Sequence, residues 1–147
     1  MTNNNHDCDA INAIEEIQAD LNLLAIYRKS GSRELPTVND LQQIEERNIS
    51  RMKATLGTVQ EANQLFEQAE RETEIVLSAQ EINGCDKLRA LAKAEVRIHR
   101  CFQIWLYSMC ASDTLKTPEK LLGAALPLVI AGNDAENHWE SLVPERA

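Results

Sequence analysis

The chain has 147 residues, of which 23 are acidic and 15 are basic, so its formal net charge is −8. Apolar residues make up 44% and charged residues 26% of it, with only 5 glycines, 4 prolines and 4 cysteines. These proportions are those of a globular protein, and they exclude the collagen-like, disulfide-dense and low-complexity classes. The length predicts one domain over residues 1–147, in which residues 1–8 are expected to form a flexible tail.

The acidic surplus disfavours nucleic acid as a partner, because affinity for nucleic acid depends on neutralising phosphates. We also expect no membrane partner, since the longest apolar run, residues 121–131, is shorter than the about 20 residues that a membrane-spanning helix needs. The polar, uncharged opening of the chain does not resemble a signal peptide, and its cysteines form no CxxC pair. These features predict a cytoplasmic protein with reduced thiols.

Apolar residues recur every three or four positions along almost the whole chain, which predicts an all-α fold. The first helix is expected from about Asp9 to Lys29, where apolar positions follow a 3-4-3 spacing that begins at Ile14. A second helix is expected to start after Pro36, because Thr37 has the residue type and the position of a helix N-cap.

Two signals disagree at Gly57. Thr58 and Glu61, which follow it, have the spacing of a capping box, and this spacing favours a break in the helix. The apolar stripe nevertheless keeps its phase across the glycine, and one glycine inside a helix costs only about 1 kcal/mol. We therefore expect a single long helix over residues 38–82.

Asn83-Gly84 predicts a turn, and a further helix is expected over residues 87–111. Its apolar seam follows a strict 3-4 alternation and comprises Leu88, Leu91, Glu95, Ile98, Phe102, Trp105 and Met109. Residues 38–82 and 87–111 are expected to form the two arms of an antiparallel helical hairpin. Residues 101–110 are apolar on every side of the helix, so we expect this stretch to be buried all round.

Thr117-Pro118 predicts the start of another helix, because proline suits the first helical position. Pro127 should kink or end this helix, and Asp134 would then cap a short terminal helix. The expected fold class is therefore all-α: a helical bundle built on the long antiparallel hairpin, with the N- and C-terminal helices packed at one end.

Charged side chains predict two stripes that point away from each other. Helical angles place four bases on the side of the second arm that lies away from its apolar seam, and four acids on a flank of the first arm. The basic docking stripe comprises Arg89, Lys93, Arg97 and Arg100. The acidic stripe comprises Glu67, Glu70, Glu74 and Glu81. Each stripe is interpreted either as a docking surface for an oppositely charged partner or as a solvated face.

Glu95 occupies a position in the apolar seam and lies one helical turn before His99. The two side chains are therefore expected to form a buried polar pair that fixes the register of the hairpin. A general base or a buried pH switch is the alternative interpretation. No cofactor or metal site is expected, because histidines and cysteines lack ligand-pair spacing, and the cysteines are interpreted as small buried apolar residues.

These features favour a small acidic non-enzymatic protein that binds other proteins through helical faces, as an adaptor, assembly factor, chaperone or inhibitor. We expect a homodimer, because the helix around residues 38–56 lacks predicted cover within the chain. The association stripe there comprises Leu41, Met52 and Leu56. Two alternatives are kept: a nucleic-acid-associated regulator that uses the basic docking stripe, and a Mg²⁺-dependent all-α enzyme that uses Glu67, Glu70 and Glu95.

Overall fold

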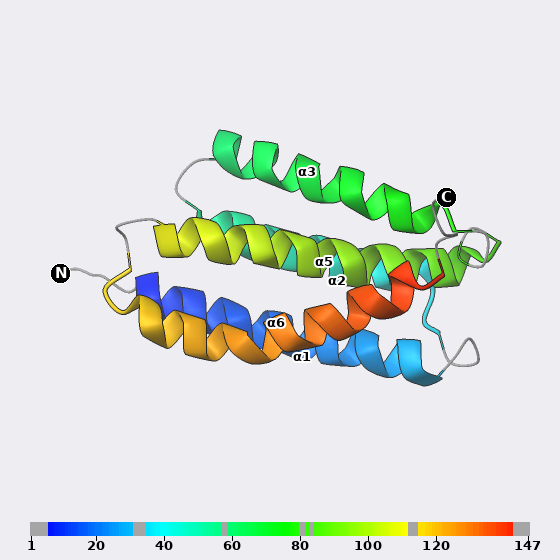
Figure 1. The fold of residues 1–147 in the computed structure, drawn as a ribbon, viewed down its shortest axis with the longest axis horizontal. Helices are drawn as coiled ribbons and strands as arrows, with labels where there is room; N and C mark the ends of the chain where they lie inside the picture. Colours follow the sequence, from blue (N-terminus) through cyan, green and yellow to red (C-terminus); the bar gives the residue numbers. More distant parts are fainter. Residues whose placement is uncertain are drawn as a thin grey trace.

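The computed structural model describes residues 6–30, 35–56, 59–79, 82, 84–111 and 115–142 of the chain. Over these residues the chain forms five α-helices (Figure 1). They are α1 (His6–Ser30), α2 (Val38–Thr55), α3 (Val59–Leu77), α5 (Asp86–Ala111) and α6 (Pro118–Glu140). The protein is therefore an all-α helical bundle, as its periodicity predicts.

The central element of the bundle is α5, which packs against each of the other four helices. Figure 1 shows α3 on one side of α5, and α1 and α6 side by side on the opposite side, with consecutive helices running in opposite directions. The expectation that the terminal helices pack at one end is wrong. With 25 and 23 residues, α1 and α6 are long enough to lie along the 26 residues of α5.

The single helix expected over residues 38–82 is also wrong. Instead, α2 ends at Thr55, Leu56 has an extended backbone with φ −87° and ψ 144°, and α3 begins at Val59. Gly57 lies outside the described residues. Because α2 and α3 are separate, both can pack against α5. One straight helix would extend past the end of α5 and leave part of its apolar stripe in water, so tertiary packing outweighs the phase of the stripe.

The apolar seam of α5 is buried as predicted. Six of its positions are at most 2% exposed: Leu91, Glu95, Ile98, Phe102, Trp105 and Met109. Burial on all sides occurs, however, in the first half of α5, where the small side chains of Ala90, Ala92 and Ala94 let the neighbouring helices approach. The expectation for residues 101–110 is wrong, since Tyr107 is 78% exposed and its hydroxyl end can stay in water.

The first turn of α1 holds the start of α6. Asp7 accepts hydrogen bonds from the backbone N–H groups of Lys116 at 2.9 Å and Thr117 at 2.8 Å, and also from the Thr117 hydroxyl. These donors precede α6, where backbone N–H groups lack helical acceptors. Residues 6–8 are therefore part of the folded bundle, and only residues 1–5 of the predicted tail lie outside the described residues.

Neither Pro127 nor Asp134 ends α6, which continues to Glu140. Proline offers no N–H to the carbonyl of Gly123, but Gly123 is exposed, so water can bond that carbonyl instead. Figure 1 shows α6 bending toward α5 in its second half. There the two helices approach closely at Gly132, where an added Cβ would lie 2.9 Å from Nδ1 of His99.

The two glycines of α6 provide a matched test of this close approach. Gly132→Ala is expected to lower the free energy of unfolding by about 1–3 kcal/mol, because the buried His99 ring has no room to move aside. Gly123→Ala is expected to raise it by about 0.5–1 kcal/mol, since a Cβ there meets no atom within 4 Å and alanine favours the helix. Urea unfolding followed by circular dichroism measures both changes. Equal effects of the two substitutions would contradict the close packing at Gly132.

Candidate functional site

The basic docking stripe does not face solvent as a unit, because acids of the neighbouring helices reach its side chains. Arg97 Nη1 donates to Glu45 Oε2 of α2 at 2.5 Å, and the two side chains are only 12% and 3% exposed. A longer contact of 3.4 Å joins Arg97 to Glu46. Lys93 is partly exposed. Glu45 lies on the buried face of α2 among apolar residues, and Arg97 neutralises its charge.

Two further bases of the stripe are bound to α3 and α6. Arg100 donates to Glu72 of α3 at 2.7 Å and to Glu140 of α6 at 2.9 Å. Arg89 donates to the carbonyl oxygen of Leu77, the last residue of α3, at 2.9 Å. A cation is favourable at that position, because the C-terminal end of a helix carries partial negative charge. These contacts connect α5 to its neighbours, and the two carboxylates neutralise the charge of Arg100.

The residues of the acidic stripe also differ in their contacts. Glu74 lies 3.6 Å from Arg89, whereas Glu67 and Glu70 are exposed on α3, and Glu81 lies outside the described residues. The expectation of two stripes that point away from each other is wrong. Helical angles on a single helix cannot show that α3 covers the side of α5 that lies away from its seam.

Glu95 lies where α5 meets α1 and α6. Its Oε1 accepts hydrogen bonds from Arg28 Nε of α1 at 2.9 Å and from Trp139 Nε1 of α6 at 2.7 Å. Burial raises the pKa of Glu95, because the attraction of Arg28 and the two hydrogen bonds do not fully offset the loss of solvent. The Arg28 side chain is itself only 7% exposed. An acid, a base and an indole from three helices therefore meet at one buried point.

His99 is buried as predicted, but it is not the partner of Glu95. Within the described residues no hydrogen bond joins the two side chains, and the cation beside Glu95 is Arg28. Burial, together with the positive charge of Arg28, lowers the pKa of His99 to about 4. The imidazole is therefore uncharged at neutral pH, and the prediction that His99 and Glu95 form a buried polar pair is wrong.

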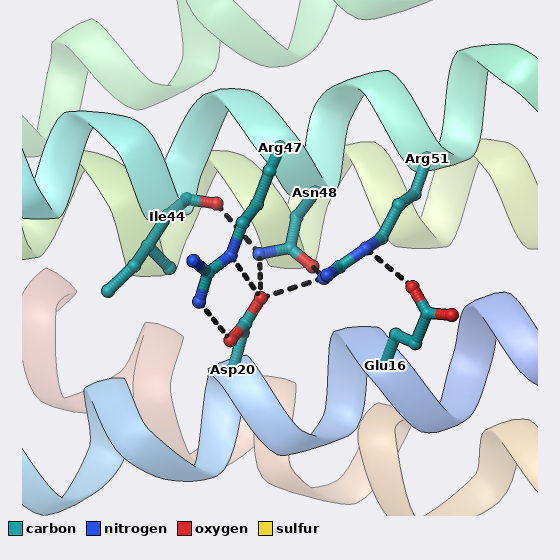
Figure 2. Close-up of polar contacts among 6 residues, drawn as sticks. All are labelled: Glu16, Asp20, Ile44, Arg47, Asn48 and Arg51. Atoms are coloured by element: carbon teal, nitrogen blue, oxygen red, sulfur yellow. Dashed lines mark hydrogen bonds and ion pairs between the residues drawn. The ribbon is translucent and has the colours of Figure 1, made fainter.

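A second buried polar cluster joins α1 to α2 (Figure 2). Asp20 accepts two hydrogen bonds from Arg47, at 2.9 and 2.6 Å, one from Asn48 at 2.9 Å and one from Arg51 at 2.7 Å. Arg51 also pairs with Glu16 at 2.8 Å. One carboxylate thus receives donors from three residues of the facing helix, which fixes how α1 and α2 lie against each other.

Asp20 was not predicted from the sequence as a site residue, although one signal was present. Asp20 lies three residues after Ile17, so it falls on the apolar face of α1, where a charged residue requires a partner. Burial by itself raises the pKa of Asp20, but the hydrogen bonds from Arg47, Arg51 and Asn48 outweigh it. The pKa of this carboxyl group therefore lies below its ordinary value.

The association stripe predicted on α2 is covered within the chain. Leu41 and Met52 are 0% exposed and belong to the core, and Leu56 is partly buried against it. Both α1 and α5 pack against α2 and supply this cover. The expectation that this stripe is open to a second copy is therefore wrong, because sequence periodicity does not show which helices fold back onto it.

Large apolar side chains do face solvent on α6. Leu122, Leu126 and Ile130 are 49%, 56% and 61% exposed, and their spacing of four residues places them along one face of the helix. We call these three residues the α6 stripe. Residues 121–133, which contain it, include no charged side chain. Other exposed large apolar residues lie singly on three other helices: Ile26, Ile75 and Tyr107.

The candidates for Mg²⁺ binding do not come together. Glu67 and Glu70 are exposed on α3, whereas Glu95 is buried among α1, α5 and α6. In the part of the chain that the structure describes, no group of three or more histidine, cysteine, aspartate or glutamate residues is placed to hold a metal ion.

The four cysteines are free thiols that differ in burial, and Cys110 is partly exposed. Cys101 is buried, and this burial raises the pKa of its thiol to about 12, so the reactive thiolate is absent at neutral pH. Cys8 and Cys85 are exposed. The interpretation of the cysteines as small buried residues is therefore correct for Cys101 and wrong for these two.

Comparisons of the chain with protein-family models, with curated proteins and with solved structures give no match. Among the described segments, no helix combines the length and the apolar character needed to cross a membrane. The function is therefore inferred from the geometry of the chain's own residues.

The α1–α2 cluster is tested by Asp20→Asn. This change is expected to lower the free energy of unfolding at pH 7 by about 2–3 kcal/mol, because two arginines lose their shared carboxylate. The deficit should shrink as the pH falls below about 4, since the lowered pKa of Asp20 stabilises the fold only while the carboxylate is ionised. Urea unfolding at several pH values measures this. Glu15→Gln, at an exposed position on the same helix, serves as the control, and an equal deficit there would contradict the role of Asp20.

Burial of an uncharged His99 predicts a loss of stability in acid. The unfolded state gains a proton near pH 6.5 but the folded state only near pH 4, so unfolding becomes easier as the pH falls between these values. The advantage of the wild-type chain over His99→Gln should therefore shrink by about 3 kcal/mol between pH 7 and pH 4. His138→Gln, which removes an exposed histidine, should change much less. A constant difference between wild type and His99→Gln would show that His99 is not buried in its neutral form.

Proposed function

We propose that this chain is a small acidic non-enzymatic protein that binds other proteins through a helical face, as an adaptor, assembly factor, chaperone or inhibitor. The observation that carries the proposal is the α6 stripe, in which three large apolar side chains, each about half exposed, lie in a helical segment, residues 121–133, that has no charged side chain. Grouped apolar surface of this kind typically marks a site of protein association. The binding face is thus placed on α6, and no longer on the association stripe of α2.

The expected strength of this contact is moderate. Covering the exposed part of three leucine or isoleucine side chains contributes on the order of 3 kcal/mol. Further contacts around the α6 stripe must add to this free energy, because association costs translational and rotational freedom. Such a surface suits a reversible complex, which is the kind that adaptors, assembly factors and inhibitors form.

The two alternative functions have less support. Arg89, Arg97 and Arg100 already contact acids or a carbonyl group of neighbouring helices, so their charges are committed within the bundle rather than offered to phosphates. Glu67 and Glu70 are exposed on α3, whereas Glu95 is buried. This difference disfavours a Mg²⁺ site shared by the three carboxylates.

The proposal places the protein in the cytoplasm. Its four cysteines are free thiols, and two of them are exposed. A reducing compartment keeps exposed thiols from forming disulfides, so this state of the cysteines suits the cytoplasm.

Photo-crosslinking in cells of the native host tests the proposed binding face. A photoreactive phenylalanine analogue is placed at Leu126, within the α6 stripe, or at Ile26, an exposed apolar position on α1. We expect discrete adducts from the position on α6 that are absent from the position on α1. Adding Ile130→Glu to the first variant should reduce those adducts about tenfold, because a buried carboxylate would oppose the contact.

The same experiment can contradict the proposal. Identical adducts from Leu126 and Ile26, or adducts from Leu126 that Ile130→Glu leaves unchanged, would show that the α6 stripe is not a binding face. Circular dichroism of each variant establishes that its helical fold is retained.

A further inference from the structure

The α6 stripe is symmetric about its central residue. Leu122 and Ile130 lie four residues before and after Leu126, with similar size and similar exposure. A second α6 that runs in the opposite direction, with Leu126 against Leu126, would bring each Leu122 beside an Ile130 of the other copy. Such a match of a surface to itself is the geometry of a two-fold symmetric interface.

The charges at the two ends of the stripe favour this antiparallel arrangement. Lys120 precedes the uncharged residues 121–133 and Asp134 follows them. The Asp134 carboxylate lies 3.4 Å from Arg28 of α1, but its side chain is 66% exposed and keeps room for a second cation. The two residues are fourteen positions apart, so at 100° per residue they fall on nearly the same flank of α6. In an antiparallel pair centred on Leu126, each Lys120 would lie about 3 Å along the helix axis from an Asp134 of the other copy. Parallel helices would instead place like charges together.

The overall charge of the chain restricts where a second copy can bind. Two molecules with a net charge of −8 repel each other, and an uncharged face is where that repulsion is weakest. A basic protein would be attracted to the acidic surface elsewhere, and an anionic lipid surface would repel the chain. Along α6, by contrast, the apolar residues match themselves in order about Leu126, and the flanking Lys120 and Asp134 have opposite charges.

From these observations we infer that two copies of the chain associate through antiparallel packing of their α6 stripes, centred on Leu126, with Lys120 of each copy paired to Asp134 of the other. This inference rests on the proposed binding role of the α6 stripe and names its partner. It replaces the α2 surface, whose residues are buried, as the contact of a homodimer.

Light scattering coupled to size-exclusion chromatography of the full chain tests the inference. At the higher of two concentrations that differ about a hundredfold, we expect twice the mass of the chain. Leu126→Glu should abolish the dimer, because two carboxylates would meet at the symmetry axis. Ile26→Glu is the matched control, since Ile26 has the same 61% exposure as Ile130 but lies outside the stripe, and it should leave the dimer unchanged.

A charge exchange tests the antiparallel direction. Lys120→Asp or Asp134→Lys alone should raise the dissociation constant about tenfold, because each creates two like-charge contacts per dimer. The double variant should return the constant to near its original value, since the exchanged charges pair again. A dimer that Leu126→Glu disrupts but that the double variant does not restore would overturn the antiparallel arrangement.

Other outcomes separate this inference from the proposed function. A dimer unaffected by Leu126→Glu would overturn the inference, because association would then use another face. A monomer at both concentrations would also overturn it. If position 126 still formed stripe-dependent crosslinks to a different protein, the proposed function would stand while the inference failed. Loss of the stripe-dependent crosslinks as well would overturn both.

Discussion

A helix surrounded by other helices can keep charged side chains only if each of them meets an opposite charge or a polar partner. α5 is in this position, and three of its charged residues, Glu95, Arg97 and Arg100, meet opposite charges from the neighbouring helices. Arg28 of α1 meets Glu95, Glu45 of α2 meets Arg97, and Glu72 of α3 and Glu140 of α6 meet Arg100. Hydrophobic burial supplies most of the driving force but has no direction. Sliding any one neighbour by a helical turn of about 5.4 Å would separate one of these pairs, so the ion pairs fix the register of the bundle.

α6 differs from the other interfaces of the bundle in its lack of charge. Polar clusters join other helices, as the Asp20 cluster joins α1 to α2, whereas α6 contributes mainly apolar and small residues over 121–133. One side of this segment fills the core through residues such as Leu121 and Leu128, and the opposite side carries the α6 stripe. Unlike the central α5, α6 lies at the periphery of the bundle, so it buries only one of its two apolar sides within the described part of the chain. The second side is the part of the fold that association would cover.

Much of the fold was predictable because it depends on local patterns. The all-α class, the seam of α5 and the capping role of Thr37, whose hydroxyl accepts from the Asp40 N–H at 3.1 Å, all follow from residue type and spacing. The candidate site was not predictable in this way. Residues 121–131 were identified as the longest apolar run, but their period does not show which side would be covered. The prediction that the basic docking stripe faces solvent was wrong for the same reason, because α2, α3 and α6 supply the acids that contact it.

The sequence by itself determined that this chain is helical, where most of the helices lie, and that Glu95 and His99 occupy a buried face. These features depend on contacts within three or four residues, which periodicity and capping reflect directly. Only the tertiary structure decided that α2 and α3 are separate helices, that Arg28 is the partner of Glu95, and that Leu41 is covered while Leu126 is not. Each of these depends on which helices meet across more than twenty residues of chain, and a charge or an apolar stripe carries no information about its partner until the helices are packed.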